Sequence, residues 1–390
     1  MKIYHVSSAP INGGATRAGL RLHLGLSQMK DVDSLWLDAG GLPDAQGVKH
    51  LNAPAEPAPM WTRVRRSQWR LKLSKNFHGV KTPFSNPLGW GHSSSFKKLS
   101  RPDVWNLHWV ANFFDWEQLL PWMAEQAPVV WTLHDLNPLM GIWHYVPSTG
   151  ELNRDREQME QAAIEIKRRA LSRIPQDRLT FVGPSKWMTE QCRQSPVTAG
   201  FPAVHIPPGL APEVFALRDT QIIRSMFGIA DDTLVLGFVA DQISDPRKGM
   251  SQLESAIMSL PDSTRAHLLM VGNGHSPKFK FPYHHLGPIQ NDYLLSFFYS
   301  ACDLFVCPSL QDNLPNTVLE ATACGTPVVA YATGGLPDMV RPGESGALAA
   351  PVGDASALKA ALETMLTHRM DLQKMRNGAR QRAVSHYGLN

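Results

Sequence analysis

The stretch "LFVCPSLQDNLPNTVLEATACGTPVVAYA", from Leu304 to Ala332, contains the alternation that decides the fold. A short apolar run leads through a polar loop into a helical segment, and a second apolar run follows. Fully apolar strands separated by helices are typical of parallel sheets that are covered on both faces. We expect Pro315 in the first turn of the helix and Gly325 at its end.

The same alternation runs through nearly the whole chain, which at 390 residues is too long for one ordinary domain. Strands are predicted at 2–8, 34–39, 104–110, 129–135, 179–185, 235–241, 266–273, 304–309 and 327–332. A Pro-rich, irregular stretch at 205–217 suggests a linker between two series of strands. We therefore predict an α/β protein with two doubly wound, Rossmann-like domains, at 1–207 and 208–390, whose parallel sheets face a central cleft. Ligands of such sheets bind at the carboxyl ends of the strands.

The composition is that of a globular protein with substantial cores, since 43% of the residues are hydrophobic and 18% are charged. No apolar stretch of about 18 residues without charge is present, so we expect no membrane-spanning helix. The apolar run at 2–8 is too short for a signal peptide and is expected to form the first strand. The four cysteines form neither a C-x-x-C pair nor a zinc spacing, which favours buried thiols in a reducing cytoplasm.

Positive charge is concentrated in the first half of the chain. The net charge is +4, with 24 Lys and Arg against 17 Asp and Glu up to residue 200. The segment 60–101 holds ten basic residues, no acidic residue, and several Trp and Phe side chains. Basic residues interleaved with aromatics suit an anionic surface such as phospholipid heads, a lipid pyrophosphate or a nucleic acid. The alternative is a solvated loop-and-helix insertion, and the residues leave both interpretations open.

Asp312 and Glu320 are the two carboxylates of the opening stretch, and they also have two interpretations. In the first, Asp312 lies in the ligand crevice, the helix that follows presents amides to an anion, and Glu320 accepts hydrogen bonds from the vicinal hydroxyls of a ribose or a sugar. In the second, Asp312 is a turn residue, and Thr317 and Glu320 form a capping box at the start of the helix.

Two further clusters lie at predicted strand ends. Arg247 and Lys248 precede Gly249 at the entry to a helix, where two cations make either a diphosphate clamp or an exposed basic turn. His134 and Asp135 end another apolar strand, where a histidine can donate to a hydroxyl or phosphate or serve a structural role. Neither His108 nor His144 completes a metal-binding spacing with them.

Gly13 and Gly14 follow the first strand and permit close approach of a ligand to the backbone. They do not form G-x-G-x-x-G, and no convincing acidic residue closes a second strand, which disfavours a nicotinamide cofactor. The absence of G-x-x-x-x-G-K-[ST] argues against a P-loop nucleotidase.

The order of these features resembles family 4 of the glycosyltransferases, which are retaining enzymes of the GT-B fold. The motifs are the Gly-Gly loop, "LHD", "VGPSKWM", "RKG", "VGNG", "PSLQDNLPNTVLEATACGTPVVAYATGG" and "GGLPDMVRPGESGALAAPVGD". The resemblance covers most of the chain and is most specific from about 235 to 355. The stretches "GGATRAGLRLHLGL", "NLHWV" and "TLHDLNPLMGIWHY" resemble the branch that builds exopolysaccharide and cell-surface glycans.

The resemblance implies roles for five charged or titratable residues. The acid pair of the family falls on Asp312, which would contact the hydroxyls of the donor sugar, and on Glu320, which would hold the ribose hydroxyls. Lys248 would bind the diphosphate with Arg247 as a second cation. His134 would lie near the transferred sugar.

The remaining donor-binding positions are also implied by the family. Gly13 and Gly14 fall on the loop that approaches the diphosphate and the acceptor. The leaving diphosphate would meet backbone of the segment made of Asn313, Leu314, Pro315, Asn316 and Thr317. The chain departs from the family where Asp312 replaces Glu, where Asp241 stands for an Arg, and in the linker "PPGLAPEVF".

We therefore expect a cytoplasmic glycosyltransferase, placed at the inner face of the membrane if 60–101 contacts lipid. Its N-terminal domain would serve the acceptor, a glycan or a lipid-linked molecule, and its C-terminal domain the nucleotide-sugar donor. Neither a cofactor nor a metal is expected, because protein cations would cover the diphosphate, and no nucleic acid is expected as a partner. The alternatives are another GT-B enzyme, such as a nucleotide-sugar epimerase, and a non-catalytic nucleotide-sugar-binding protein.

Overall fold

The chain divides into two compact units, unit 1 from Met1 to Ile206 and unit 2 from Pro207 to Asn390. The computed structural model describes residues 1–8, 13–39, 47–51, 59–91, 93–96, 99–275, 277–367 and 369–388. Each unit has its own sheet and its own core, and the acceptor and donor roles given to the two domains stay predictions.

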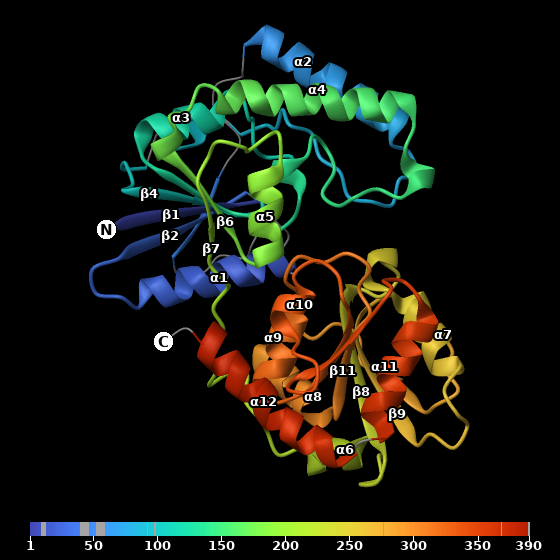
Figure 1. The fold of residues 1–390 in the computed structure, drawn as a ribbon. Coiled ribbons are helices and arrows are strands. Elements are labelled where there is room, and N and C mark those ends of the chain that lie inside the picture. The colour runs from blue at the N-terminus through green and yellow to red at the C-terminus, as the bar shows by residue number, and fades with distance from the viewer. Residues whose placement is uncertain are drawn as a thin grey trace. The chain divides into compact units, whose positions relative to one another are not determined.

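Unit 1 is built on a seven-stranded parallel sheet with the order β3-β2-β1-β4-β5-β6-β7 (Figure 1). Its strands are β1 Lys2–Ser7, β2 Asp33–Asp38, β3 Val48–His50, β4 Val104–Leu107, β5 Val129–Thr132, β6 Leu179–Gly183 and β7 Ala203–His205. Its α-helices are α1 Gly14–Ser27, α2 Met60–Asn76, α3 Leu119–Gln126, α4 Arg154–Leu171 and α5 Lys186–Gln194. The strand order reverses between β1 and β4, where a doubly wound sheet opens toward a ligand.

Unit 2 repeats this plan with a six-stranded parallel sheet in the order β10-β9-β8-β11-β12-β13 (Figure 1). Its strands are β8 Leu234–Gln242, β9 Ala266–Asn273, β10 Tyr283–His285, β11 Leu304–Cys307, β12 Val328–Tyr331 and β13 Gly346–Ala349. Its α-helices are α6 Gln221–Met226, α7 Met250–Met258, α8 Asp292–Ala301, α9 Asn316–Ala323, α10 Leu336–Met339, α11 Ala355–Thr367 and α12 Arg369–Tyr387.

The predicted fold class, two doubly wound parallel sheets, is confirmed. The strands that were not predicted, β3, β7, β10 and β13, have only three or four residues each and lie at the ends of the sheets. Such short strands show no periodicity that could separate them from loops.

Strand β11 explains why the opening stretch is apolar at every position. Leu304 and Val306 pack into one core of unit 2, and Phe305 and Cys307 into the other, on the opposite face of the sheet. A strand buried on both faces leaves no position for a polar side chain, so polar groups are displaced to its ends.

The cysteines and helices agree with two further expectations. Cys192, Cys302, Cys307 and Cys324 are free thiols in buried positions, and burial raises the pKa of Cys307 to about 11. Among the described residues, no helix combines the length and the apolar character needed to span a bilayer.

The loop after β11 is held between the loops that follow β8 and β12. The backbone N–H of Leu310 donates to the carbonyl of Arg247 at 2.7 Å, and Thr333 Oγ1 donates to the carbonyl of Leu310 at 3.2 Å. Gly249 has a left-handed backbone (φ 73°), and a Cβ atom there would lie 1.8 Å from the carbonyl oxygen of Pro308. Gly249 is therefore required both by its backbone and by its neighbour.

We predict that Gly249→Ala destabilises unit 2 much more than Gly343→Ala does. Gly343 also has positive φ (79°), but a Cβ there would meet no atom within 4 Å. Its replacement should cost about 1 kcal/mol from the backbone alone, whereas at Gly249 the loops must also separate, so the loss should be at least about twice as large. Urea unfolding followed by circular dichroism measures the free energy of unfolding of both variants. Equal losses would contradict the close contact of Gly249 with the loop after β11.

Candidate functional site

Lys248 and Asp312 meet at the carboxyl ends of two neighbouring strands of unit 2. Lys248 Nζ lies 2.6 Å from Asp312 Oδ2, and Ser309 Oγ donates to the same oxygen at 3.4 Å. The two partners are 64 residues apart in the chain and are only 26% and 12% exposed. The structure thus brings together two of the predicted site residues, although their roles stay predictions.

Arg247 is held by its own turn. Its guanidinium lies 2.5 Å from Asp245 Oδ2, and its backbone N–H donates to Asp245 Oδ1 at 3.0 Å. Asp245 caps the short 3-10 turn Pro246–Lys248, and Arg247 is mostly buried. The sequence did not identify Asp245, which positions the second predicted cation beside the first.

The beginning of α9 differs from both sequence-based expectations. Pro315 is the N-cap of the helix, not a residue of its first turn, and Thr317 is already the second helical residue. Pro315 makes no side-chain bond to the helix amides, and the N-cap position that a capping box would give to Thr317 belongs to Pro315, so the capping box between Thr317 and Glu320 is wrong. A proline N-cap has no hydroxyl to accept from the helix amides, and the N–H of Thr317 at position N2 has no acceptor within the helix.

Glu320 is instead buried inside unit 2, where it is 2% exposed. Tyr299 of α8 donates its hydroxyl to Glu320 Oε2 at 2.9 Å. The predicted end of the helix is confirmed: Gly325 follows the C-cap, and the amides of Gly325 and Thr326 donate to the carbonyls of Thr322 and Ala321. This double bond pattern is a Schellman motif.

The other donor-side positions line the approach to α9. Asn313 and Pro315 are buried, and Leu314, Asn316 and Thr317 are partly exposed. Because the first amides of a helix carry partial positive charge, this end of α9 offers a place for an anion close to Lys248.

His134 of unit 1 stands at the end of a chain of histidines. Its Nε2 lies 3.2 Å from His108 Nδ1, and His108 Nε2 lies 3.1 Å from His5 Nδ1. The ring of His23 lies 5.6 Å from that of His5 and Trp36 stacks on His108 at 5.3 Å. The chain could not be predicted from sequence, because its members come from β1, α1 and the ends of β4 and β5.

Burial keeps these histidines neutral. It lowers the pKa of His5 to about 3, with the neighbouring His23 adding to the effect, and that of His134 to about 4, opposed by the charge of Asp135. Burial and the surrounding imidazoles also hold the pKa of His108 well below its ordinary value. At neutral pH, His134 is therefore a hydrogen-bonding group and not a cation.

We predict that unit 1 loses stability on mild acidification. Between about pH 6.5 and the lowered pKa values, the unfolded chain binds more protons than the folded chain. The free energy of unfolding therefore decreases as the pH decreases, by about 2 kcal/mol from His5 alone at pH 5. All 11 tryptophans precede residue 200, so their fluorescence follows unit 1 in urea titrations. In His5→Gln the difference between pH 7.5 and 5 should shrink by that amount. Equal losses of stability in the parent protein and in His5→Gln would contradict the lowered pKa of His5.

Gly13 and Gly14 open helix α1, with Gly13 as its N-cap at φ −69° and ψ 141°. This conformation is open to any residue, so backbone geometry does not require glycine at position 13. The role implied for the pair stays a prediction.

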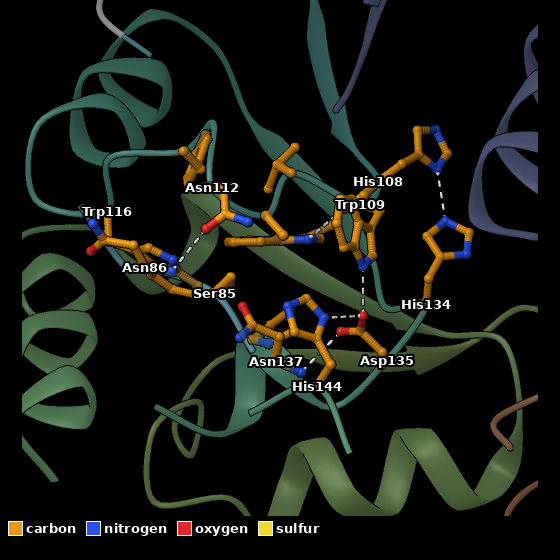
Figure 2. A pocket seen from close by; sticks show the side chains of 15 residues that line it. Ser85, Asn86, His108, Trp109, Asn112, Trp116, His134, Asp135, Asn137 and His144 are labelled. Carbon is orange, nitrogen blue, oxygen red and sulfur yellow. Dashed lines mark hydrogen bonds and ion pairs between the residues drawn. The ribbon is translucent and has the colours of Figure 1, made fainter. Parts of the chain in front are cut away.

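A pocket of unit 1 is lined by residues that follow β4 and β5 (Figure 2). His134 lies on its lining together with Asp135 and His144, whose Nδ1 is 2.5 Å from Asp135 Oδ2. The sequence drew attention to these residues but did not place them in a common site. Their pairing depends on a loop that brings residue 144 back to the strand end. Among the described residues, no group of three or more His, Cys, Asp or Glu side chains could hold a metal ion.

The basic segment 60–101 begins with helix α2, and residues 92, 97 and 98 lie outside the described residues. Arg66 pairs with buried Asp115 at 2.8 Å, and Arg65 pairs with Glu117. These two cations therefore hold α2 to unit 1. Both have a partner within unit 1, and the contact of segment 60–101 with an anionic surface stays a prediction.

Comparison with known proteins finds a family match that lies within unit 2. Residues 233–368 match the family "Glycosyl transferases group 1". The D-inositol 3-phosphate glycosyltransferase of Geodermatophilus obscurus is 32% identical over 182 residues, which are 40% of this chain and 39% of that protein. That of Stackebrandtia nassauensis is 36% identical over 161 residues, 36% of each chain. The chain thus matches about two fifths of the length of these curated relatives.

Solved structures are similar over the whole chain. Sucrose-phosphate synthase from Thermosynechococcus elongatus has a TM-score of 0.68 at 18% identity, covering 100% of this chain and 95% of that one. The Anabaena protein HepE in complex with UDP-glucose has a TM-score of 0.67 at 17% identity, covering 100% and 96%. This likeness shows the fold class, two Rossmann-like domains of the GT-B type.

Proposed function

We propose that this protein is a retaining glycosyltransferase that moves a sugar from a nucleotide-sugar donor to a glycan or lipid-linked acceptor. The observation that carries the proposal is the Lys248–Asp312 pair at the carboxyl ends of β8 and β11, beside the start of α9, whose N-cap residue is Pro315. Both residues lie in the segment that matches the glycosyltransferase family.

The chemistry of transfer fits this arrangement. Cleavage of the sugar–phosphate bond builds negative charge on the departing diphosphate, and fixed positive groups stabilise that charge. Lys248 has three N–H donors, so it can keep its bond to Asp312 and still bind a phosphate oxygen. Arg247, oriented by Asp245, and the first amides of α9 add to the same field. We propose that these groups act without a metal ion.

The acceptor-proton step follows from the retaining reaction class. In a front-side transfer, the acceptor hydroxyl attacks the anomeric carbon as the bond to the phosphate oxygen breaks, and that oxygen takes the hydroxyl proton. Neutral His134 would then serve as a hydrogen-bond partner near the transferred sugar and not as the base.

The identities of the donor and the acceptor are more specific proposals. The complexes of HepE with UDP and UDP-glucose make UDP-sugars the first donors to test. The relatives named for D-inositol 3-phosphate make that molecule one acceptor to test beside glycans and lipid-linked sugars of cell-surface polysaccharide synthesis. We place the reaction in the cytoplasm, at the inner face of the membrane.

We predict that Glu320→Gln weakens binding of the donor by about tenfold. The amide oxygen of glutamine still accepts a hydrogen bond from the ribose hydroxyls but carries no charge, and a bond to a charged group exceeds a neutral one by about 1–1.5 kcal/mol, close to a tenfold change in affinity. Calorimetry with the UDP-, GDP- or ADP-sugar that most raises the melting temperature of the parent measures the affinity.

The matched control is Tyr299→Phe, which removes the internal hydrogen bond to Glu320 but keeps the carboxylate. It should lower the melting temperature and change donor affinity less. Unchanged donor affinity in Glu320→Gln, with a lowered melting temperature, would make Glu320 a structural residue. Product analysis with and without acceptor separates a transferase from an epimerase, and binding without turnover would indicate a binding protein.

Helix α2 supports a contact with an anionic membrane. Its outward residues combine exposed apolar and basic side chains, namely Met60, Trp61, Val64 and Leu71 with Arg63, Arg70, Lys72 and Lys75. Its other side packs through Leu73 and Phe77 onto Met159 and Ala163 of α4. An apolar stripe flanked by cations is typical of helices that lie in a lipid interface.

We predict that Arg70→Glu/Lys72→Glu reduces sedimentation with vesicles of anionic lipid by severalfold at low salt, because each cation near such a surface contributes about 1 kcal/mol. The control is Lys30→Glu/Lys49→Glu, an equal change of charge at two exposed lysines elsewhere in unit 1. Equal sedimentation of the two variants with the vesicles would contradict a membrane contact through α2.

A further inference from the structure

The histidine chain of unit 1 joins three neighbouring strands of the sheet. His5 lies on β1, and His108 and His134 follow β4 and β5. Their ring nitrogens are 3.1 and 3.2 Å apart, so each ring is hydrogen-bonded to the next. His5 and His108 are buried, whereas His134 is partly exposed. The histidine chain therefore leads from the core of unit 1 to a ring at the strand ends.

A hydrogen-bonded series of neutral imidazoles has only two arrangements of its hydrogens. All three rings are neutral at pH 7, because burial lowers the pKa of each. A neutral ring has one N–H donor and one acceptor nitrogen. The bonds join Nε2 of His134 to Nδ1 of His108, and Nε2 of His108 to Nδ1 of His5. The hydrogen is therefore on Nδ1 in all three rings or on Nε2 in all three.

The inner end of the histidine chain does not oppose this shared tautomer. His5 Nε2 is buried, and no hydrogen-bond partner is found for it within the described part of the protein. A change of tautomer at His134 alone would place two hydrogens, or two lone pairs, between His134 and His108. Buried polar groups that cannot form their hydrogen bond cost free energy. The tautomer of His134 therefore depends on His108 and, through it, on His5.

The orientation of the rings is fixed by packing from β2 and α1. Trp36 stacks on His108 at 5.3 Å between ring centroids and on His5 at 6.0 Å. Gly19 and His23 are buried residues of α1, one turn apart. A Cβ atom at Gly19 would lie 2.7 Å from Cη2 of Trp36 and 3.0 Å from Nδ1 of His108, the atom that is bonded to His134. Glycine at this position thus leaves room for the ring of His108.

We propose that His108 and His5 are positioning residues for His134, which hold its ring in one orientation and one tautomer. The ring would then meet the transferred sugar in a single hydrogen-bonding form. A fixed dipole needs no reorganisation during the reaction, and a small misplacement of such a group lowers the rate. The contact of His134 with the sugar rests on the function proposed above, whereas the shared tautomer does not.

Nitrogen-15 NMR of the protein labelled in its histidine rings tests the shared tautomer directly. Single substitutions assign the signals of His5, His108 and His134. At pH 7.5 the three rings should be neutral and should carry the hydrogen on the same nitrogen. Different tautomers among the three rings, or a protonated ring, would overturn the proposal.

Two variants of equal shape test the action of His108 on His134. The amide of His108→Asn can take the place of Nδ1 and bond to Nε2 of His134, whereas His108→Leu has no polar atom there. His108→Leu should change the ring signals of His134 to an average of both tautomers. It should also lower kcat of sugar transfer by about tenfold, the effect expected from one hydrogen bond. His108→Asn should keep several times the kcat of His108→Leu, and equal losses in the two variants would overturn the proposal.

A third variant changes the packing without removing a polar group. Gly19→Ala should shift the ring signals of His108 and His134 and lower kcat by severalfold, because its methyl group meets His108. The control is Gly150→Ala in unit 1, where a Cβ atom would meet no atom within 4 Å. If Gly19→Ala leaves both kcat and the ring signals unchanged, as Gly150→Ala should, the proposed positioning is wrong.

Donor binding separates these tests from that of the proposed function. In all the variants, affinity for the donor sugar nucleotide measured by calorimetry should stay within about twofold of the parent value, because the donor groups belong to unit 2. A variant that loses kcat only through loss of donor affinity would contradict positioning of His134. If the parent protein transfers no sugar, the transferase proposal fails, and the NMR signals still decide whether the three rings share one tautomer.

Discussion

Burial of each parallel sheet on both faces is the constraint on which the rest of this structure depends. Strands such as β11 have no face for a polar side chain, so charge and hydrogen-bonding groups collect where the strands end. In unit 2 that edge holds Lys248 and Asp312, and in unit 1 it holds His134 and Asp135. The ion pair contributes little to stability at its partial exposure, and its importance lies in fixing two loops in one place.

The buried polar groups of unit 1 follow a different rule. Lys167 is held entirely by carbonyls of one loop, and burial lowers its pKa to about 7, opposed by Glu160 and Asp135. The histidine chain that ends at His134 is neutral for the same reason. The histidine chain therefore offers hydrogen bonds without carrying charge, in contrast to the Lys248–Asp312 pair at the edge of unit 2.

Sequence reasoning succeeded where the evidence was local and periodic. The alternation of apolar runs predicted the sheets, and it placed Lys248 and Asp312 at strand ends, where ligands of such sheets bind. It failed where a local motif had two readings: the spacing of Thr317 and Glu320 fits a capping box, but Pro315 takes the N-cap position. The partners of Arg66 and His144 were out of reach, because they depend on how distant loops pack.

The division of the polar groups between two cores has an evolutionary consequence. The contacts that hold Lys248, Asp312 and Glu320 in place come from unit 2, and those that hold Asp135 and His144 come from unit 1. Each set is therefore positioned by the core of its own unit. Under the proposed function, mutation or recombination near residue 206 can change the specificity of one half through the residues of that half alone.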